Sequence, residues 1–156
     1  MSTSTQTAFQ ITPKADPASP AERAALLANP GFGRVFSEHM AIVTYTEGEG
    51  WHTPQILPRQ PLTLDPAASV LHYAQEIFEG MKAYRATNGE ALLFRPDANA
   101  RRFRHSAERM AMAQLPEELF LDAVTQLVKI DNGWIPAADV GTLYIRPFML
   151  ATEAAL

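Results

Sequence analysis

The stretch from Leu71 to Arg85 constrains the fold more than any other part of the sequence, because it joins a helical pattern to an alternating one. Its first half predicts a short amphipathic helix with Ser69 as the N-cap. We expect Gly80 to end this helix, since glycine adopts the left-handed conformation without steric cost. From Met81 the alternation predicts a strand that leads into Asn88-Gly89, a strong two-residue hairpin signal.

Helices and strands alternate along the rest of the chain, without a strict strand–helix–strand rhythm. Runs of β-branched and aromatic residues predict strands at His39 to Tyr45, Glu90 to Phe94 and Thr142 to Met149. Two helices are expected, one from Asp97 as N-cap to about Met112, and one from Pro116 to Asn132-Gly133. The sequence therefore predicts an α+β (mixed α/β) fold.

The composition excludes several classes of protein. Hydrophobic residues make up 47% of the 156 residues, which is enough for the core of one domain. No apolar run approaches the roughly 20 residues of a membrane helix, and a net charge of −4 argues against nucleic acid as a partner. The absence of cysteine excludes disulfides and a thiol nucleophile and suits a cytoplasmic protein. The four histidines lack the spacing of metal ligands, so no metal site is expected.

Four motifs follow one another in the sequence: FGRVFSEHM from Phe32, LHYAQEIFEGMKAYR from Leu71, LLFRPDANARRF from Leu92 and LYIRP from Leu143. Together they resemble the branched-chain amino acid aminotransferases, which are fold-type IV (class IV) pyridoxal-phosphate enzymes. The resemblance implies that residues 31–156 form the N-terminal small domain of a two-domain enzyme. Residues 1–30, rich in Ser, Thr, Ala and Pro, are expected to be a loosely ordered N-terminal lead.

The resemblance implies pyridoxal 5'-phosphate as cofactor. In the pattern F-R-P-x-x-N-x-x-R it assigns Arg102 to the cofactor phosphate, and the planar guanidinium fork suits a phosphate dianion. Arg101 has no counterpart in the pattern and is expected on the surface. Arg95, which precedes a proline, is expected to be structural.

The same resemblance implies a set of substrate-binding residues. Phe32, Tyr73 and Phe78 match aromatic residues that line the pocket for a branched side chain. Tyr144 and Arg146 are alternate residues of the last strand, so their side chains lie on one face. In the family the arginine of this Y-x-R pair can meet the side-chain carboxylate of glutamate, which lets one pocket accept leucine-like and glutamate substrates in turn.

A pyridoxal-phosphate transaminase also needs a lysine that holds the cofactor as a Schiff base and moves the substrate's proton. The chain has Lys14, Lys82 and Lys129, none of them in the family's lysine context. We therefore expect the Schiff-base lysine to lie beyond Leu156 and the chain to be truncated before the large domain. No catalytic residue is predicted within it, and the fragment alone is expected to be inactive.

Three functions follow from these observations. The leading one is transamination of leucine, isoleucine and valine with 2-oxoglutarate, giving branched 2-oxo acids and glutamate, in a cytoplasmic homodimer without nucleic-acid or membrane partners. A second is another fold-type IV activity, that of a D-amino acid transaminase or an aminodeoxychorismate lyase. The third comes from a different class, a non-catalytic dimerisation or binding module.

Overall fold

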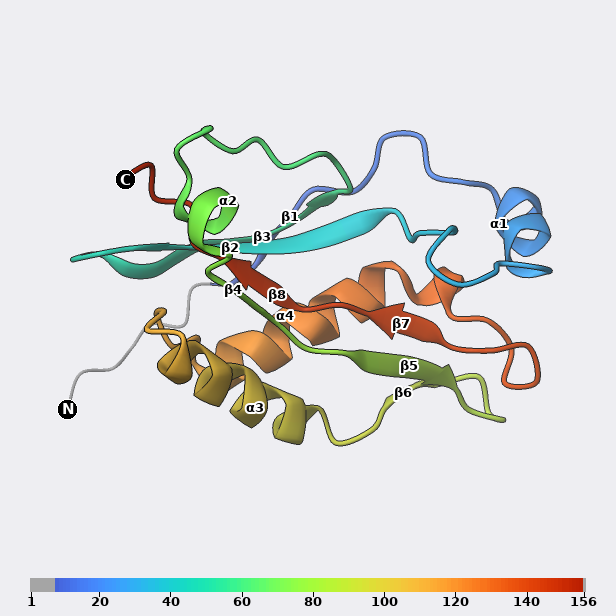
Figure 1. The fold of residues 1–156 in the computed structure, drawn as a ribbon. Coiled ribbons are helices and arrows are strands. Elements are labelled where there is room, and N and C mark those ends of the chain that lie inside the picture. Colours follow the sequence, from blue (N-terminus) through green and yellow to red (C-terminus); the bar gives the residue numbers. More distant parts are fainter. Residues whose placement is uncertain (1–7, 156) are drawn as a thin grey trace.

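Two helices cover one face of a long ribbon of strands in the computed structural model, which describes residues 8–155 (Figure 1). The helices are α3, Pro96–Arg109, and α4, Glu117–Ile130. Residues 1–7 of the predicted lead and Leu156 lie outside the described residues. Helices and strands are mixed along the chain, as the sequence predicts.

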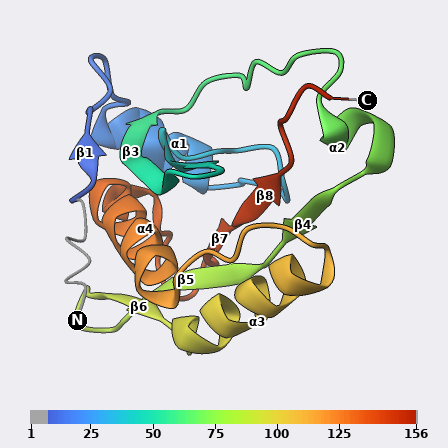
Figure 2. The same ribbon diagram turned by 90° about the vertical axis from the view of Figure 1, so that its left-hand side faces the viewer.

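The ribbon consists of two antiparallel pairs of strands that lie end to end. β4, Glu76–Phe78, pairs antiparallel with β8, Phe148–Leu150, and β5, Met81–Arg85, pairs antiparallel with β7, Leu143–Ile145. The short β6, Ala91–Leu93, adds to the other side of β5 after a turn that runs from Ala86 to Gly89. Both ribbon views show β4 running into β5 alongside β7 and β8 (Figures 1 and 2). Segments far apart in the sequence therefore lie side by side along the ribbon.

Alternation along the ribbon separates a core face from an exposed face. The core face carries the buried Ile77, Met81 and Ala83, which pack with α3 and α4. On the helices, Phe103 and Phe120 lie with their ring centroids 5.3 Å apart. Every second side chain of the strands thus packs against the apolar faces of the two helices. The side chains in between lie on the outer face of the ribbon, which these helices do not cover.

A second sheet lies against the other side of α4. Its order is β1-β3-β2, with β1 at Gln10–Ile11 parallel to β3 at Gly50–Pro58, and β2 at His39–Thr46 antiparallel to β3. Helix α1, Pro20–Leu27, starts with a capping box in which the Ser19 hydroxyl and the Glu22 carboxylate bond each other's backbone N–H. Among the helices of residues 8–155, none has the length and apolar character needed to cross a membrane.

The predicted end of the first helix is wrong. Helix α2 covers only Ser69–Tyr73, its N-cap is Ala68, and it ends at Ala74, a left-handed residue with φ 50°. Gly80 lies instead between β4 and β5. The pairing of β4 with β8 accounts for the difference, because the backbone from Glu76 onward forms its hydrogen bonds with a distant strand and leaves the helix early.

Two other predicted boundaries also shift. The N-cap of α3 is Arg95, with φ 46°, rather than Asp97, which lies in the first turn and pairs with Arg101. The predicted strand from Thr142 to Met149 is interrupted at Pro147, which has no N–H to donate. The predicted start of α4 is confirmed, with Pro116 as its N-cap.

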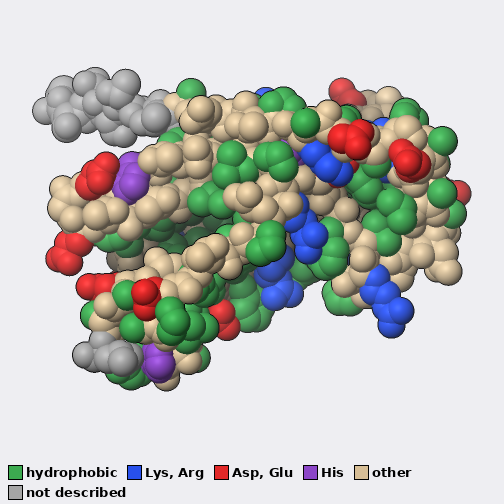
Figure 3. Space-filling model, turned by 90° about the horizontal axis from the view of Figure 1, so that it is seen from above, with side chains coloured by type: hydrophobic (Ala, Val, Ile, Leu, Met, Phe, Trp, Pro, Cys, Tyr) green, Lys and Arg blue, Asp and Glu red, His purple; other side chains and the backbone are tan. Residues whose placement is uncertain are grey.

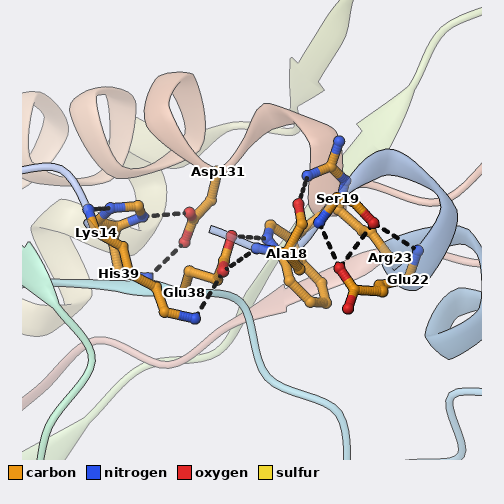
Figure 4. Close-up of polar contacts among 9 residues, drawn as sticks. Lys14, Ala18, Ser19, Glu22, Arg23, Glu38, His39 and Asp131 are labelled. Atoms are coloured by element: carbon orange, nitrogen blue, oxygen red, sulfur yellow. Dashed lines mark hydrogen bonds and ion pairs between the residues drawn. The ribbon is translucent and has the colours of Figure 1, made fainter. Parts of the chain in front are cut away.

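A buried histidine joins the described part of the lead to the body of the fold (Figure 4). The His39 Nδ1 atom lies 2.6 Å from an Asp131 carboxylate oxygen, and the His39 N–H donates to the other oxygen at 3.0 Å. The backbone N–H of Lys14 donates to the His39 Nε2 atom at 3.0 Å. Asp131 is only 2% exposed and lies just after α4, so this chain of contacts connects the lead, β2 and the end of α4.

Glu38 adds a second connection between the lead and the body. Its carboxylate accepts hydrogen bonds from the Lys14 ammonium at 2.9 Å, the Ala18 N–H at 2.7 Å and the Trp134 indole N–H at 3.2 Å. Burial raises the pKa of Glu38, but these hydrogen bonds outweigh it and leave the pKa below its ordinary value. Residues 8–30, expected to be loosely held, thus make specific contacts to the body, while a domain boundary at residue 30 stays a prediction.

The left-handed Ala74 offers a test of backbone strain. An alanine at φ 50° pays a steric penalty that glycine avoids. Ala74→Gly should therefore raise the free energy of unfolding by about 0.5–1 kcal/mol. Ala25→Gly, at an exposed position inside α1, should instead lower it by about 1 kcal/mol. Urea denaturation of both variants checks the pair, and a loss of stability at Ala74 would contradict the assigned conformation.

Candidate functional site

The exposed face of the ribbon holds several of the predicted site residues. The alternation that buries Ile77 and Met81 turns Phe78 and Gly80 outward. On the neighbouring strands, Tyr144, Arg146 and Phe148 are exposed on the same face. An aromatic surface with one cation is therefore presented by strands whose opposite face is anchored in the core.

Arg146 is held in place by aromatic side chains on both strands. Its Nη2 and Nε atoms donate to the Tyr144 phenol oxygen at 2.9 and 3.3 Å. Its guanidinium carbon lies 4.5 Å from the centroid of the Phe78 ring, a cation–π distance. This arrangement keeps the guanidinium over the Phe78 ring while its remaining N–H groups stay available to a carboxylate.

Phe32 joins this group, and Tyr73 does not contact it. The Phe32 ring meets the Tyr144 ring edge-on, with the centroids 6.0 Å apart, although Phe32 is 84% exposed. Tyr73 is 63% exposed on α2, and its ring packs near that of its neighbour His72. Among residues 8–155, no aromatic or hydrogen-bond contact joins Tyr73 to Arg146 or Phe78. The structure brings four of the five predicted substrate residues together.

A hollow of about 350 Å³ lies beside this aromatic surface. It is lined by Tyr144 and Gly80 on the ribbon side and by the first turns of α3 on the other. Three cationic side chains face it, those of Lys82, Arg95 and Arg102. The local charge is therefore positive, which favours an anionic ligand.

Arg102 is fixed at the hollow by a buried carboxylate. Its Nε and Nη2 atoms donate to the two oxygens of Glu79 at 2.9 and 2.8 Å. Glu79 is only 8% exposed and also accepts from the Asn99 amide at 2.8 Å and from the Gly80 N–H at 3.3 Å. A buried carboxylate requires this many donors, because desolvation without them is costly.

The Glu79 pair leaves the outer edge of Arg102 for a ligand. Its Nη1 atom has no hydrogen-bond partner within the described residues, and the side chain is 66% exposed. The hydrogen bond from Arg102 is the largest influence on the pKa of Glu79 and lowers it; burial opposes this, and the bond from Asn99 supports it. Glu79 therefore stays ionised at neutral pH and holds the guanidinium plane with its free edge outward.

Arg101 differs from its neighbour, as the sequence predicts. It pairs with Asp97 at 2.8 Å on the exposed side of α3, where both side chains are more than half exposed. Arg95, expected to be structural, caps α3 and also lines the hollow.

Glu79 and Asn99 were not predicted as site residues. The sequence did contain a signal for Glu79. This residue lies two positions from both Ile77 and Met81, so its side chain is expected on the core face of the strand, where a charged residue needs a partner. Asn99 precedes Arg102 by three positions, which places both on one face of a helix. The pairing between strand and helix could not be derived from local sequence.

Several large apolar side chains are exposed to solvent. Seen from above, hydrophobic side chains are scattered over the molecule, some of them next to a central group of lysine and arginine side chains (Figure 3). Phe32, Phe94, Tyr73 and Phe78 are each more than 60% exposed. Such exposure of large aromatic residues is typical of a surface that another protein segment or a ligand covers.

The Glu79 network predicts a specific dependence on pH. Because the folded-state pKa lies below the ordinary value of 4.5, the network stabilises the fold above pH 4.5 and loses this effect as the pH falls through the folded-state pKa. Glu79→Gln should therefore be less stable than the unmodified protein at pH 7, and the difference should shrink below about pH 4.5. Denaturant titrations across this range measure it.

Asp97→Asn is the matched control for this prediction, since it removes a carboxylate from an exposed pair on the same helix. It should change stability little at any pH. An equal effect of the two substitutions, or a Glu79→Gln difference that persists unchanged in acid, would show that the hydrogen bonds to the ionised Glu79 carboxylate are not the source of the stabilisation.

Comparisons with known proteins agree with the resemblance found in the motifs. The chain is 52% identical over 149 residues to a probable branched-chain-amino-acid aminotransferase of Streptomyces coelicolor, which covers 95% of this chain and 41% of that protein. It is 54% identical over 126 residues to the branched-chain-amino-acid transaminase 1 of Bacillus subtilis, covering 81% of this chain and 35% of the relative. The chain thus spans about two fifths or less of the curated relatives it matches. A scan against protein-family models gave no match.

A solved structure shares the fold. It is a branched-chain amino acid aminotransferase from T.th., complexed with N-(5'-phosphopyridoxyl)-L-glutamate. It superposes with a TM-score of 0.54 at 26% identity, covering 65% of this chain and 32% of the other. The expected fold-type IV architecture is confirmed by this match. The family resemblance is confirmed as well, for along 95% of its length this chain is similar to the N-terminal part of branched-chain-amino-acid aminotransferases.

Proposed function

We propose that the protein to which this chain contributes transaminates leucine, isoleucine and valine with 2-oxoglutarate, using pyridoxal 5'-phosphate as cofactor. The observation that carries the proposal is the meeting of Arg146, Tyr144, Phe78 and Phe32 on one face, next to the cationic hollow at Arg102. Sequence identity of about half with branched-chain aminotransferases supports it.

The residues at the hollow fit the phosphate of the cofactor. Arg102 offers an outer edge whose N–H groups are aimed away from Glu79, and the first turn of α3 lies at the same hollow. A guanidinium and the amide groups of a helix N-terminus both favour a phosphate dianion. Lys82 and Arg95 add positive charge to the lining. We therefore assign Arg102 to the phosphate, with Glu79 holding its guanidinium plane.

The aromatic surface suits the substrate side chain. The rings of Phe32, Phe78 and Tyr144 offer apolar contact to a branched hydrocarbon and exclude water from it. Arg146 lies over the Phe78 ring and can offer its free N–H groups to the second carboxylate of glutamate or 2-oxoglutarate. Tyr73, on α2, contacts none of these side chains, and its assignment to the same pocket rests on the family resemblance.

Pyridoxal phosphate, when bound, withdraws electrons from the α-carbon of the amino acid. The residues of this chain bind and orient: Arg102 holds the phosphate, and Arg146 with Tyr144 discriminates the substrate side chain. They supply proximity and electrostatic complementarity rather than proton transfer.

The proposal includes a homodimer. Its support is the exposure of large aromatic residues, with Phe32 at 84% and Phe94 at 73%. Contact with a second subunit would remove such side chains from water.

The phosphate assignment predicts a difference between adjacent arginines. In the complete protein, Arg102→Leu should weaken pyridoxal phosphate binding roughly ten- to hundredfold, because it removes charge-assisted hydrogen bonds. Arg101→Leu, on the same helix turn, should change the affinity by less than about twofold. Fluorescence titration of the apoprotein gives both constants, and equal losses would reject the assignment of Arg102.

The substrate assignment predicts that Arg146 separates the two half-reactions. Arg146→Met keeps much of the side-chain volume and removes the charge. We expect kcat/KM for glutamate and 2-oxoglutarate to fall by roughly one to three orders of magnitude, and the leucine half-reaction to change much less.

Single-turnover measurement of each half-reaction in the complete protein is the required test, since steady-state rates mix the two. Absence of transamination between leucine and 2-oxoglutarate in the unmodified protein would reject the proposed function. Equal losses on both substrates in the variant would reject only the role of Arg146.

A further inference from the structure

Gly80 lies opposite Arg146 in the ribbon, although neither residue is part of a strand. Phe78 pairs with Phe148 and Met81 with Ile145, and between them the Glu79 N–H donates to the Pro147 carbonyl at 2.8 Å. The antiparallel register therefore continues through the gap between β4 and β5.

A side chain at position 80 has no room. A Cβ atom added to Gly80 would lie 2.4 Å from the Tyr144 phenol oxygen and 3.2 Å from the adjoining ring carbon. Real Cβ atoms essentially never come within 3.0 Å of another heavy atom. The backbone at Gly80 is outside the left-handed region, so the backbone itself would admit alanine. Glycine is needed here for space and not for conformation.

The space left by Gly80 is filled by the Tyr144 phenol. This phenol accepts both hydrogen bonds from Arg146, whose guanidinium lies over Phe78. Tyr144 is 39% exposed, and its ring also meets the Phe32 ring edge-on. The position of the Arg146 guanidinium thus depends on the Tyr144 phenol. The position of the phenol in turn depends on the absence of a side chain at Gly80.

We propose that Gly80 is a specificity-determining position of the substrate pocket. It seats the Tyr144 phenol against the backbone and thereby holds Arg146 where it can meet the second carboxylate of a dicarboxylic amino acid or oxo acid. Gly80 acts through these two side chains as a positioning residue. The inference rests on the proposed function, and in particular on the role assigned to Arg146.

The test is Gly80→Ala in the complete protein, with each half-reaction measured in single turnovers. We expect kcat/KM for glutamate and 2-oxoglutarate to fall roughly tenfold or more, and that for leucine by less than about threefold. Gly141→Ala is the matched control. Gly141 precedes β7, its backbone is outside the left-handed region, and an added Cβ would meet only Pro136 Cγ at an ordinary 3.8 Å. It should leave both half-reactions unchanged.

A double variant separates seating of the phenol from a general structural effect. Tyr144→Phe removes the oxygen that overlaps the added methyl group and also removes the acceptor for Arg146. It should itself reduce the glutamate half-reaction, and Gly80→Ala added to it should cost less than about twofold more. Losses that multiply independently would overturn the proposal, as would equal losses on leucine and glutamate in Gly80→Ala.

The same variants distinguish the possible failures. If Arg146→Met impairs the glutamate half-reaction and a folded Gly80→Ala does not, the inference is wrong and the proposed function stands. If Arg146→Met changes neither half-reaction, the dual recognition on which the inference rests is wrong. If Gly80→Ala does not fold, judged by circular dichroism, the double variant carries the test. It should fold and match Tyr144→Phe, and its failure to fold would overturn the proposal.

Discussion

A carboxylate buried beneath the ribbon, that of Glu79, is the interaction on which the site depends. A buried charge is tolerated here because both oxygens of the carboxylate accept hydrogen bonds, from four donor groups in all. Two of the donors, Asn99 and Arg102, belong to α3, so satisfying the charge also fixes the helix against the strand. With α3 fixed, Phe103 packs on Phe120 and the outer edge of Arg102 faces the hollow.

The alternation of the strand converts this buried anchor into an exposed surface. Since Glu79 points into the core, Phe78 and Gly80 on either side of it must point outward. A shift of one residue in the pairing would expose the carboxylate and bury Phe78, so the register is strongly specified. The buried anchor and the exposed aromatic surface are thus built from consecutive residues, and neither can be placed without the other.

Some helix starts and turns could be predicted from the sequence, because they depend on the few residues around them. The start of α4 at Pro116 and the hairpin near Asn88-Gly89 follow from capping and turn preferences, and both are present in the structure. The loop is longer than the predicted two residues, since the turn runs from Ala86 to Gly89 and only Gly89 is left-handed. The end of α2 was misplaced because Ala74 is held in a left-handed conformation by the pairing of β4 with β8, which no local pattern encodes. For the same reason the shared face of Tyr144 and Arg146 could be predicted, while the stacking of Arg146 on Phe78 required the register between distant strands.

The ribbon has a consequence for the order in which the protein folds. Its two halves are separated in the sequence by both covering helices, α3 and α4. Pairing the two halves closes a long loop, which costs conformational entropy. This cost arises before the contacts between the strands can stabilise the fold. As the chain emerges from the ribosome, the hairpin of β2 and β3 and the two helices can form early, while the ribbon must wait for β7 and β8. The aromatic surface is therefore among the last parts of the fold to assemble, and until then its side chains are exposed to other chains.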